Sequence, residues 1–397
     1  MTNLKCIIII SIGIVLTSKA AFAYEKPVRG LWVPCEGTYR ALESKDKIDR
    51  LLAISQQIGI SDLFIQIYRG NRAWYPSKLV DDTPYRNIFN KTSFDTFNYL
   101  LKQAHKKNIK IHAWCNIFRI ARNNKAVILE KMGTSSITKD NRGRSLLSYN
   151  NFKIPLPERN YYENTIDGIW LEQGNPDVQS FLLEVLKEIL VIYPDIDGIH
   201  LDYVRYPFLT PVKLGSRFSH GIDFGYGEKS IERFGIKKGF NPLVMSHLNR
   251  QQAQIWDNWR RKQITEFIEK AYKATKSHNK NLSAAVIGWK DIAYNGAFQN
   301  WMDWIDRGII DFVIPMIYTT DLSAFKYLTE STVSLNRKSS VFLGIGAYLF
   351  DPELMTDFSL FFAYLNRVKP EGIVLFSFDS IIENKQQLEF LKEVIQK

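Results

Sequence analysis

The residues best suited to chemistry lie in one short stretch, DIDGIHLDYVRYP, at residues 195–207. It begins as a buried strand and then places Asp202, Tyr203, Arg205 and Tyr206 within five residues, before a proline ends it. An ionised carboxylate can attack a carbon atom or activate water, and a nearby guanidinium favours the charged form. The stretch therefore predicts that Asp202 acts as a nucleophile or general base.

Other polar and aromatic side chains are predicted to gather around Asp202. Side chains alternate along a strand, so if Ile199 and Leu201 face outward, then His200 and Asp202 face inward. The same alternation gives a predicted inward set on other strands: Trp32, Glu36, Gln66, Tyr68, His112, Trp114, Asn116, Trp289, Tyr318, Ser377 and Asp379. Aromatic rings stack on sugar faces, and carboxylates and amides bond the hydroxyl groups. The set predicts a carbohydrate site, because a purely structural barrel fills these layers with Val, Ile and Leu.

Strand and helix patterns alternate through the chain and position these residues. Short runs rich in Ile, Val and Phe predict eight strands: Val28 to Val33, Asp62 to Tyr68, Lys110 to Phe118, Ile196 to Tyr203, Leu282 to Trp289, Phe312 to Thr319, Val341 to Ala347, and Gly372 to Phe378. Amphipathic stretches predict eight helices: Lys45 to Gln57, Phe94 to Lys107, Pro176 to Ile192, Pro242 to Ser277, Phe298 to Arg307, Leu322 to Leu335, Pro352 to Val368, and Lys385 to Gln396.

This alternation predicts an α/β fold, a (β/α)8 TIM barrel. A doubly wound open sheet is the alternative, but it has fewer units, and no Gly-rich phosphate turn follows the first strand. Two long connections, residues 119–175 after strand three and residues 208–241 after strand four, lie on the face where barrel enzymes carry their sites. The composition of the first suits a sugar-binding wall, and the glycines of the second suit a mobile lid.

The N-terminus has the pattern of an export signal. Lys5 precedes an apolar run over residues 6–16, and residues 21–23 form an A-x-A cleavage pattern. We expect a signal peptide over residues 1–23 and a single domain over residues 24–397. The protein is then exported, periplasmic or secreted, without a stable membrane anchor.

The net charge of the chain bears on the class of its binding partner. Fifty-two basic and 41 acidic residues give a net charge of +11, and removal of Lys5 and Lys19 leaves 50 − 41 = +9. Such a surface attracts polyanions. No nucleic-acid motif accompanies the charge, so a polysaccharide is the expected partner.

Cys35 and Cys115 are predicted outward on strands that are not neighbours, so we expect no disulfide. His112 and His200 are predicted as hydrogen-bonded lumen residues, and no cofactor or metal is expected.

Five motifs in order resemble the family 10 glycosyl-hydrolase-like proteins, which are mostly exported bacterial (β/α)8 barrels. They are RGLWV at 29–33, HAWCN at 112–116, GNPDVQSFLLEVLKEIL at 174–190, DGIHLDYVRYP at 197–207 and WMDWIDRGIIDFVIPMIYT at 301–319. The resemblance implies hydrolysis of glycosidic bonds, in some members those of peptidoglycan glycan strands stripped of peptides. It implies a site of Asp202, Tyr203, Arg205 and Tyr206 with Trp114, Asn116 and Tyr318.

Glycoside hydrolysis generally requires two carboxyl groups. Many family members carry Asp-Asp-Tyr where this chain has Leu201-Asp202-Tyr203. The segment is also similar to strand four of family 18 chitinases, but Val204 stands where their acid residue should be. The partner is therefore predicted from another strand: Asp321 or Glu36 first, then Asp379 or Asp291. A non-catalytic glycan-binding barrel of the cell wall is the alternative, and attachment to wall polymers through the +9 charge is a third hypothesis.

Overall fold

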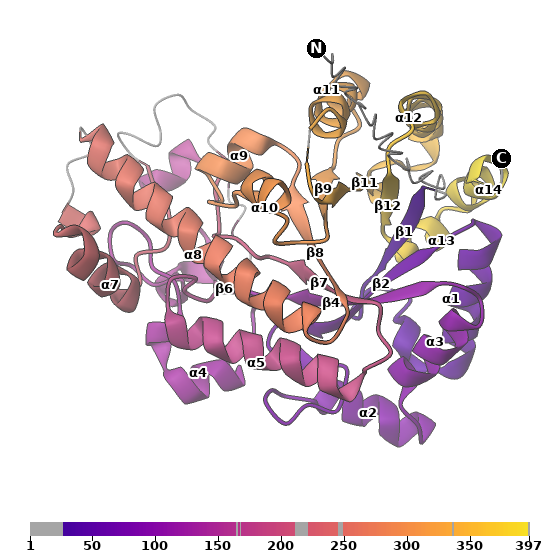
Figure 1. Ribbon diagram of the computed structural model, residues 1–397, viewed down its shortest axis with the longest axis horizontal. Coiled ribbons are helices and arrows are strands. Elements are labelled where there is room, and N and C mark those ends of the chain that lie inside the picture. The colour runs from indigo at the N-terminus through magenta and orange to yellow at the C-terminus, as the bar shows by residue number, and fades with distance from the viewer. Residues whose placement is uncertain are drawn as a thin grey trace, which may run out of the picture.

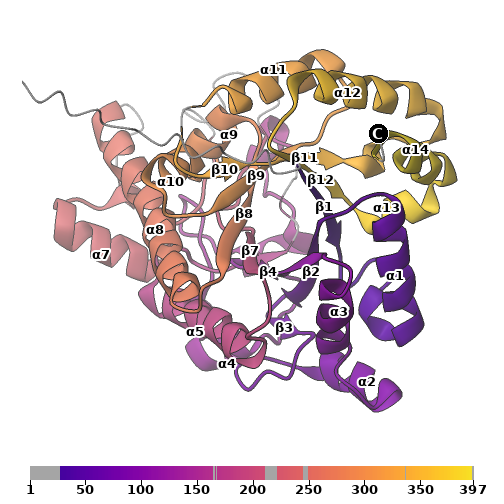
Figure 2. The ribbon, with the colours of Figure 1, turned by 45° about the vertical axis from the view of Figure 1, so that its right-hand side comes forward.

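The computed structural model describes residues 27–163, 166, 168–210, 221–244, 249–335 and 337–395. The predicted signal peptide, residues 1–23, lies outside the described residues. Figures 1 and 2 show a ring of strands at the centre with helices packed around it.

The strand ring is a closed parallel barrel of eight strands. In chain order they are β1 (Val28–Val33), β2 (Asp62–Arg69), β4 (Lys110–Asn116), β7 (Gly198–Asp202), β8 (Asn281–Ile287), β9 (Phe312–Ile317), β11 (Leu343–Gly346) and β12 (Gly372–Phe376). β1 pairs with both β2 and β12, and this pairing closes the ring. Two short strands extend it: β3 (Arg72–Ala73) pairs with β2, and β10 (Ser340–Val341) pairs with β9. The predicted (β/α)8 fold is confirmed.

The predicted helices form the outer ring: α1 (Lys45–Gln57), α3 (Thr96–His105), α5 (Pro176–Ile192), α8 (Arg250–Lys276), α10 (Trp301–Arg307), α11 (Leu322–Val333), α12 (Met355–Val368) and α14 (Lys385–Ile395). The bounds of α5 match the prediction because Asn175 caps its first turn and Pro176 opens it. The sequence did not predict α2 (Thr83–Thr92), α4 (Val127–Met132), α7 (Glu228–Lys238), α9 (Lys290–Asn295) or α13 (Phe378–Glu383). No helix within the described ranges is long and apolar enough to span a membrane.

Short 3-10 turns occupy several connections: Ala41–Glu43, Thr134–Ser136, Leu146–Ser148, Asn150–Phe152, Glu158–Tyr161, Pro242–Val244, Ala347–Leu349 and Pro352–Leu354. Two predicted helix starts, at Pro242 and Pro352, fall on such turns rather than on the α-helices that follow them.

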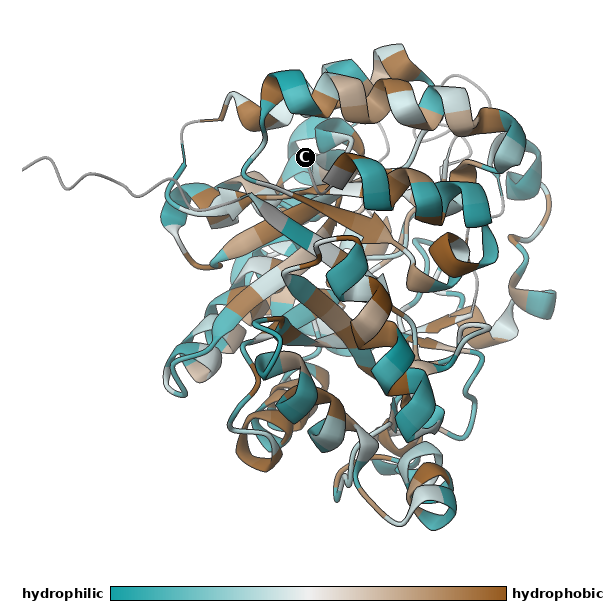
Figure 3. Cartoon of the chain, turned by 90° about the vertical axis from the view of Figure 1, so that its right-hand side faces the viewer, coloured by the Kyte–Doolittle hydropathy of each residue, from teal (hydrophilic) through white to brown (hydrophobic). Residues whose placement is uncertain are grey.

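Apolar side chains of the barrel divide between two cores, and a separate cluster of Tyr226, Phe234, Trp256 and Trp259 joins α7 to α8. The larger core lies between strands and helices and contains Leu31, Ile111 and Leu201, as outward-facing strand residues should. The smaller core fills the lumen with Trp32, Phe64, Trp114, Phe312, Ile314, Phe342 and Val374. Figure 3 is coloured by hydropathy and shows hydrophobic, brown strands inside, with hydrophilic, teal segments on the helices that surround them. Cys35 and Cys115 are buried free thiols in the larger core, and burial raises the pKa of both.

The two long connections pack against each other, and we call residues 119–163, 168–175 and 221–238 the loop wall. In the first connection, β5 (Arg119–Ala121) pairs with β6 (Ile169–Trp170). The buried carboxylate of Asp140 accepts hydrogen bonds from Arg144 Nε at 2.7 Å and from Tyr149 Oη at 2.7 Å. Asn141 then donates to carbonyl oxygens of the second connection, from its backbone N to Asp223 at 3.0 Å and from Nδ2 to Gly221 at 2.9 Å.

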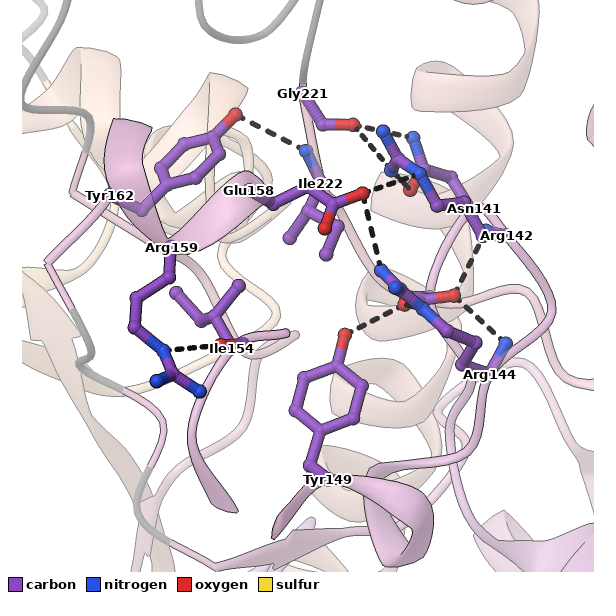
Figure 4. Close-up of polar contacts among 11 residues, drawn as sticks. Asn141, Arg142, Arg144, Tyr149, Ile154, Glu158, Arg159, Tyr162, Gly221 and Ile222 are labelled. Atoms are coloured by element: carbon purple, nitrogen blue, oxygen red, sulfur yellow. Dashed lines mark hydrogen bonds and ion pairs between the residues drawn. The ribbon is translucent and has the colours of Figure 1, made fainter. Parts of the chain in front are cut away.

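Figure 4 shows this network with Arg142, whose Nε lies 2.7 Å from the buried Glu158 carboxylate. A second buried carboxylate joins the two connections elsewhere. Glu172 accepts from Ser230 Oγ at 2.6 Å and from the Gly227 N–H at 3.1 Å. Because buried carboxylates are costly unless they are bonded, these contacts fix the loop wall. Residues 221–238 thus pack against the first connection, the mobile lid stays a prediction, and residues 211–220 lie outside the described residues.

Candidate active site

Asp202 ends β7 at the carboxyl end of the barrel, where its side chain turns into the lumen. Oδ2 accepts a hydrogen bond from Trp114 Nε1 at 3.2 Å, and Oδ1 accepts one from the Tyr203 backbone N–H at 2.7 Å. Burial raises the pKa of Asp202, although Tyr203, Arg205 and Trp114 each oppose this change. Arg205 therefore acts in the expected direction, toward the charged form, but the cost of burying the charge is larger.

Arg205 lies in an aromatic cage beside Asp202. Its guanidinium carbon is 4.8 Å from the Trp170 ring centre, 5.2 Å from that of Tyr203 and 5.1 Å from that of Phe208. Arg119 covers Tyr203 as well, at 5.0 Å. Burial lowers the pKa of Arg205, but a guanidinium remains charged at any physiological pH. The cage therefore holds two positive charges and several aromatic faces at the mouth of the barrel.

A ring-lined rim extends from Trp114 toward strands six to eight. The Trp114 ring packs edge-on against Phe376, at 6.2 Å between centres. Phe376 in turn contacts Tyr318 and Tyr348, each at 5.8 Å. Burial raises the pKa of Tyr318 well above its ordinary value, and the Asp202 charge adds to the effect, which places this phenol in the neighbourhood of the carboxyl group. These contacts put Trp114 and Tyr318 on the same rim as Asp202.

Beneath Asp202 the lumen holds a neutral histidine. His200 Nε2 lies 3.0 Å from Trp32 Nε1, which can only donate, so the ring proton sits on Nδ1, 2.9 Å from Ser283 Oγ. Burial lowers the pKa of His200 well below its ordinary value. His112 bonds Asp62 Oδ1 at 2.9 Å. Both histidines are thus hydrogen-bonded lumen residues, as predicted, and no cluster of metal-ligating side chains occurs among the residues described above.

Several predicted sugar contacts lie too deep to touch a ligand. Trp32 and Gln66 are each 1% exposed, and Asn116 is 3% exposed. Gln66 Nε2 donates to Asn116 Oδ1 at 3.1 Å, while its Oε1 accepts from the Cys35 N–H at 3.3 Å. These side chains therefore support the floor of the site, and the partly exposed Tyr203, Arg205 and Tyr318 form its accessible surface.

Tyr68 and Tyr206 do not face the site. A register shift between Gln66 and Tyr68 reverses the alternation on β2, so the Tyr68 ring packs in the outer core and its hydroxyl accepts from Asn71 Nδ2 at 2.9 Å. Tyr206 is fully buried, with its ring edge-on to Phe298 at 5.6 Å. The predicted role of either residue in binding is therefore wrong, because no face of either ring is accessible.

Strand eight also departs from the prediction. Val374 and Phe376 face the lumen, and Ser377 is already the N-cap of α13. Asp379 lies in the first turn of α13, where its Oδ1 accepts from Thr38 Oγ1 at 3.1 Å and from the Tyr39 N–H. This carboxylate joins α13 to the loop after β1, and its predicted place in the lumen is wrong.

The other candidate carboxylates are engaged elsewhere or lie apart. Glu36 bridges Arg69 at 3.1 Å and Arg72 at 2.8 Å, and it lines a cavity of about 550 Å³ between the loop after β1 and α2. Asp321 is exposed and caps α11 by accepting from the Ser323 and Ala324 N–H groups. Asp291 is exposed in the first turn of α9 and lines a cavity of about 350 Å³ that also contains Phe208, the ring beside Arg205.

Two buried glutamines hold the backbone that carries the site, and neither was predicted. Gln299 Nε2 donates to the Val204 carbonyl at 3.3 Å, while its Oε1 accepts from the Ile287 N–H at 2.9 Å. Gln173 Nε2 donates to the Arg205 carbonyl at 3.1 Å. They secure a segment in which Tyr203 has a positive φ of 53°, a strained conformation for a bulky residue. A glutamine carries no sequence signal for such a bond, since its partner is a backbone atom distant in the chain.

The sequence profile of the family described as Glycosyl hydrolase-like 10 matches residues 27–348. The chain belongs to this family. It is 22% identical over 291 residues to Glycosyl hydrolase DigH of Escherichia coli (strain K12), covering 69% of this chain and 57% of that protein. It is 23% identical over 364 residues to Glycosyl hydrolase YngK of Bacillus subtilis (strain 168), covering 83% of this chain and 63% of that one. The family member described here thus spans less than two thirds of the length of these relatives.

Solved structures support the same fold. The glycoside hydrolase domain of PgaB (BpsB) from Bordetella bronchiseptica is similar with a TM-score of 0.63 and 11% identity, over 93% of this chain and 99% of that chain. The catalytic domain of a beta-amylase from Paenibacillus polymyxa is similar with a TM-score of 0.56 and 10% identity, over 93% and 97% of the two chains. At these identities the likeness establishes the barrel fold of this family member.

Proposed function

We propose that this protein is a glycoside hydrolase that cleaves glycosidic bonds in a bacterial polysaccharide, the glycan strands of peptidoglycan. The observation that carries the proposal is the partly buried Asp202, which lies at the carboxyl end of a central strand among Trp114, Tyr203 and Arg205. Barrel enzymes carry their reacting groups at this end of the strands. Aromatic faces beside charged hydrogen-bonding groups are suited to a sugar.

Asp202 is assigned here the role of general acid. A general acid must keep its proton at the working pH, and burial raises the pKa of Asp202 in that direction. A nucleophile or base must be ionised, and the pKa direction opposes that role. Asp202 would protonate the oxygen of the leaving sugar, while a second carboxylate attacks the anomeric carbon or activates water.

Asp291 is the candidate for the second carboxylate with the fewest competing contacts. Two arginines bind Glu36, the N-terminus of α11 binds Asp321, and the loop after β1 binds Asp379. Asp291 makes no hydrogen bond or ion pair with the described residues, and it shares a cavity with Phe208 of the arginine cage. Replacement of each acid by its amide, one at a time, tests this ranking.

The decisive experiment measures the release of reducing ends from peptide-free glycan strands. Asp202→Asn is expected to lower the rate by about 10²- to 10⁴-fold, the usual contribution of a general acid. Asp306→Asn, on the exposed face of α10, serves as the control and should retain full activity. Equal activity of Asp202→Asn and Asp306→Asn removes Asp202 from the mechanism.

A non-catalytic glycan-binding barrel is the second candidate function. It is favoured by the engagement of Glu36, Asp321 and Asp379 in other contacts. This candidate predicts retention on glycan strands without release of reducing ends, in the unmodified protein and in all the amide variants alike.

The N-terminal pattern supports a location outside the cytoplasmic membrane for the proposed reaction. Residues 1–23 have the sequence features of an export signal. Cell fractionation with residues 1–23 present or deleted tests this location, and an unchanged distribution between the two forms contradicts it.

A further inference from the structure

Two exposed aromatic rings on the carboxyl face of the barrel lie outside the site described above. Trp289 is 44% exposed and Tyr327 is 62% exposed, and their ring centres are 6.1 Å apart with a tilt of 35°. Single exposed apolar side chains need no explanation. Two rings from different elements, each open to solvent and each near the other, form a surface on which a flat ligand can stack.

The register of the barrel places this pair near Asp202. Leu201 of β7 pairs with Ala284 of β8, so Asp202 is level with Ala285, and Trp289 follows four residues later. At ~3.3 Å per residue and ~4.8 Å between strands, the two backbone positions are at most about 14 Å apart. Tyr327 lies on α11, which follows the next strand, β9. The pair thus occupies the same rim, one and two strands along from Asp202.

The pair is also held in place. Trp289 is the N-cap residue of α9, and the neighbouring Lys290 Nζ donates to the Ser331 carbonyl near the end of α11. This bond ties together the two helices that carry the rings. A surface ordered before binding loses less conformational entropy when a ligand arrives.

We propose that Trp289 and Tyr327 form an outer subsite that stacks a sugar ring of a glycan chain extending beyond Asp202. This inference rests on the proposed function, since the occupant is the same polysaccharide. It implies that the protein engages long chains along their length rather than only at their ends. Short fragments that fill the centre alone do not reach the outer rings.

The test compares glycan binding by Trp289→Ala, Tyr327→Ala and the double variant, each in the Asp202→Asn background. The ligands are size-fractionated peptide-free glycan strands and disaccharides from the same material. Each single variant should weaken the binding of long strands by about threefold to tenfold and leave disaccharide binding unchanged. Phe89→Ala is the matched control, because the exposed Phe89 and the partly exposed Tyr85 on α2 form a pair of similar geometry, 5.8 Å apart with a tilt of 36°.

Equal binding of long strands by the variants and the control overturns the outer subsite, and so does an equal loss on long and short ligands. A different result is expected if the protein is not a hydrolase but the outer subsite exists. In that case the chain with intact Asp202 releases no reducing ends, while long strands still bind more weakly to the Trp289→Ala and Tyr327→Ala variants. A change in oligomeric state with unchanged glycan binding assigns the rings to a protein contact and overturns the subsite.

Discussion

Replacing Trp114 by Phe tests the role of Asp202 through the direction of a pH shift. The substitution removes the Nε1 donor that lies 3.2 Å from Asp202 Oδ2 and keeps an aromatic ring against Phe376. A hydrogen bond to a charged group contributes about 1.5–3 kcal/mol, and 3.2 Å is at the long end of the range, so the lower value applies. At 1.36 kcal/mol per pKa unit, loss of the bond should raise the pKa of Asp202 by about one unit.

The sign of the effect separates the two possible roles. A general acid works while it is protonated, so a higher pKa moves the alkaline limb of the profile of kcat/KM against pH to higher pH by about one unit. A nucleophile or base works while it is ionised, so the same change moves the acidic limb upward and lowers activity near that limb. The assay is release of reducing ends from glycan strands over a range of pH.

Trp32→Phe is the matched control for this experiment. Trp32 also donates from Nε1 inside the lumen, but its acceptor is His200 Nε2 at 3.0 Å. In Trp32→Phe neither limb of the pH profile should move, because the lost hydrogen bond does not involve Asp202. A pH profile for Trp114→Phe with both limbs unmoved refutes the reasoning, because Asp202 would then not be the group that sets either limb.

Three further predictions concern groups that support the site or the fold. Gln299→Leu leaves the Val204 carbonyl and the Ile287 N–H without their partner, so the free energy of unfolding in urea should fall by about 2–4 kcal/mol. Gln299→Glu should lose at least as much, because a carboxylate buried beside carbonyl oxygens cannot replace the donor. Arg260→Met leaves the Asp223 and Asp257 carboxylates, 2.7 and 2.6 Å from the buried guanidinium, without that charge; a loss of about 3–5 kcal/mol is expected, and a loss below ~1 kcal/mol contradicts the assignment. Burial acts to raise the pKa of Asp62, but the hydrogen bond and charge of His112 outweigh burial and lower this pKa. The ionised Asp62 therefore stabilises the fold above pH ~4, and this stabilisation is lost as the pH falls further. Between pH ~4 and ~2 the Tm of the unmodified chain should fall more steeply than that of Asp62→Asn.

Much of the fold could be predicted because periodicity is a local signal. Outward Ile199 and Leu201 fixed the inward direction of His200 and Asp202, and the structure has the same alternation on β7. On β2 the alternation failed at Tyr68, since the register shift after Gln66 leaves no mark in residue types. On strand eight it failed because Ser377 and Ser380 bond each other and start α13 where a longer strand was predicted.

The site was harder to predict than the fold because its properties depend on distant contacts. Arg205 and Asp202 are close in sequence, which suggested a charged carboxylate, but the burial that raises the Asp202 pKa comes from rings on other strands. The burial of Tyr206 likewise depends on Phe298, which is remote in the chain. The bonds of Gln173 and Gln299 to backbone carbonyls can be found only once the chain is folded.

The buried contacts of Asp140 and Glu172 have a consequence for how the two long connections move. Asp140 bonds Arg144 and Tyr149, its neighbour Asn141 bonds residues 221 and 223, and Glu172 bonds Gly227 and Ser230. Separating the two segments would expose the Glu172 carboxylate and break its bonds together with those of Asn141, whereas the bonds of Asp140 stay within the first segment. Residues 136–149, 172 and 221–230 therefore form one cooperative unit, whose amide protons exchange with solvent through a shared opening rather than loop by loop.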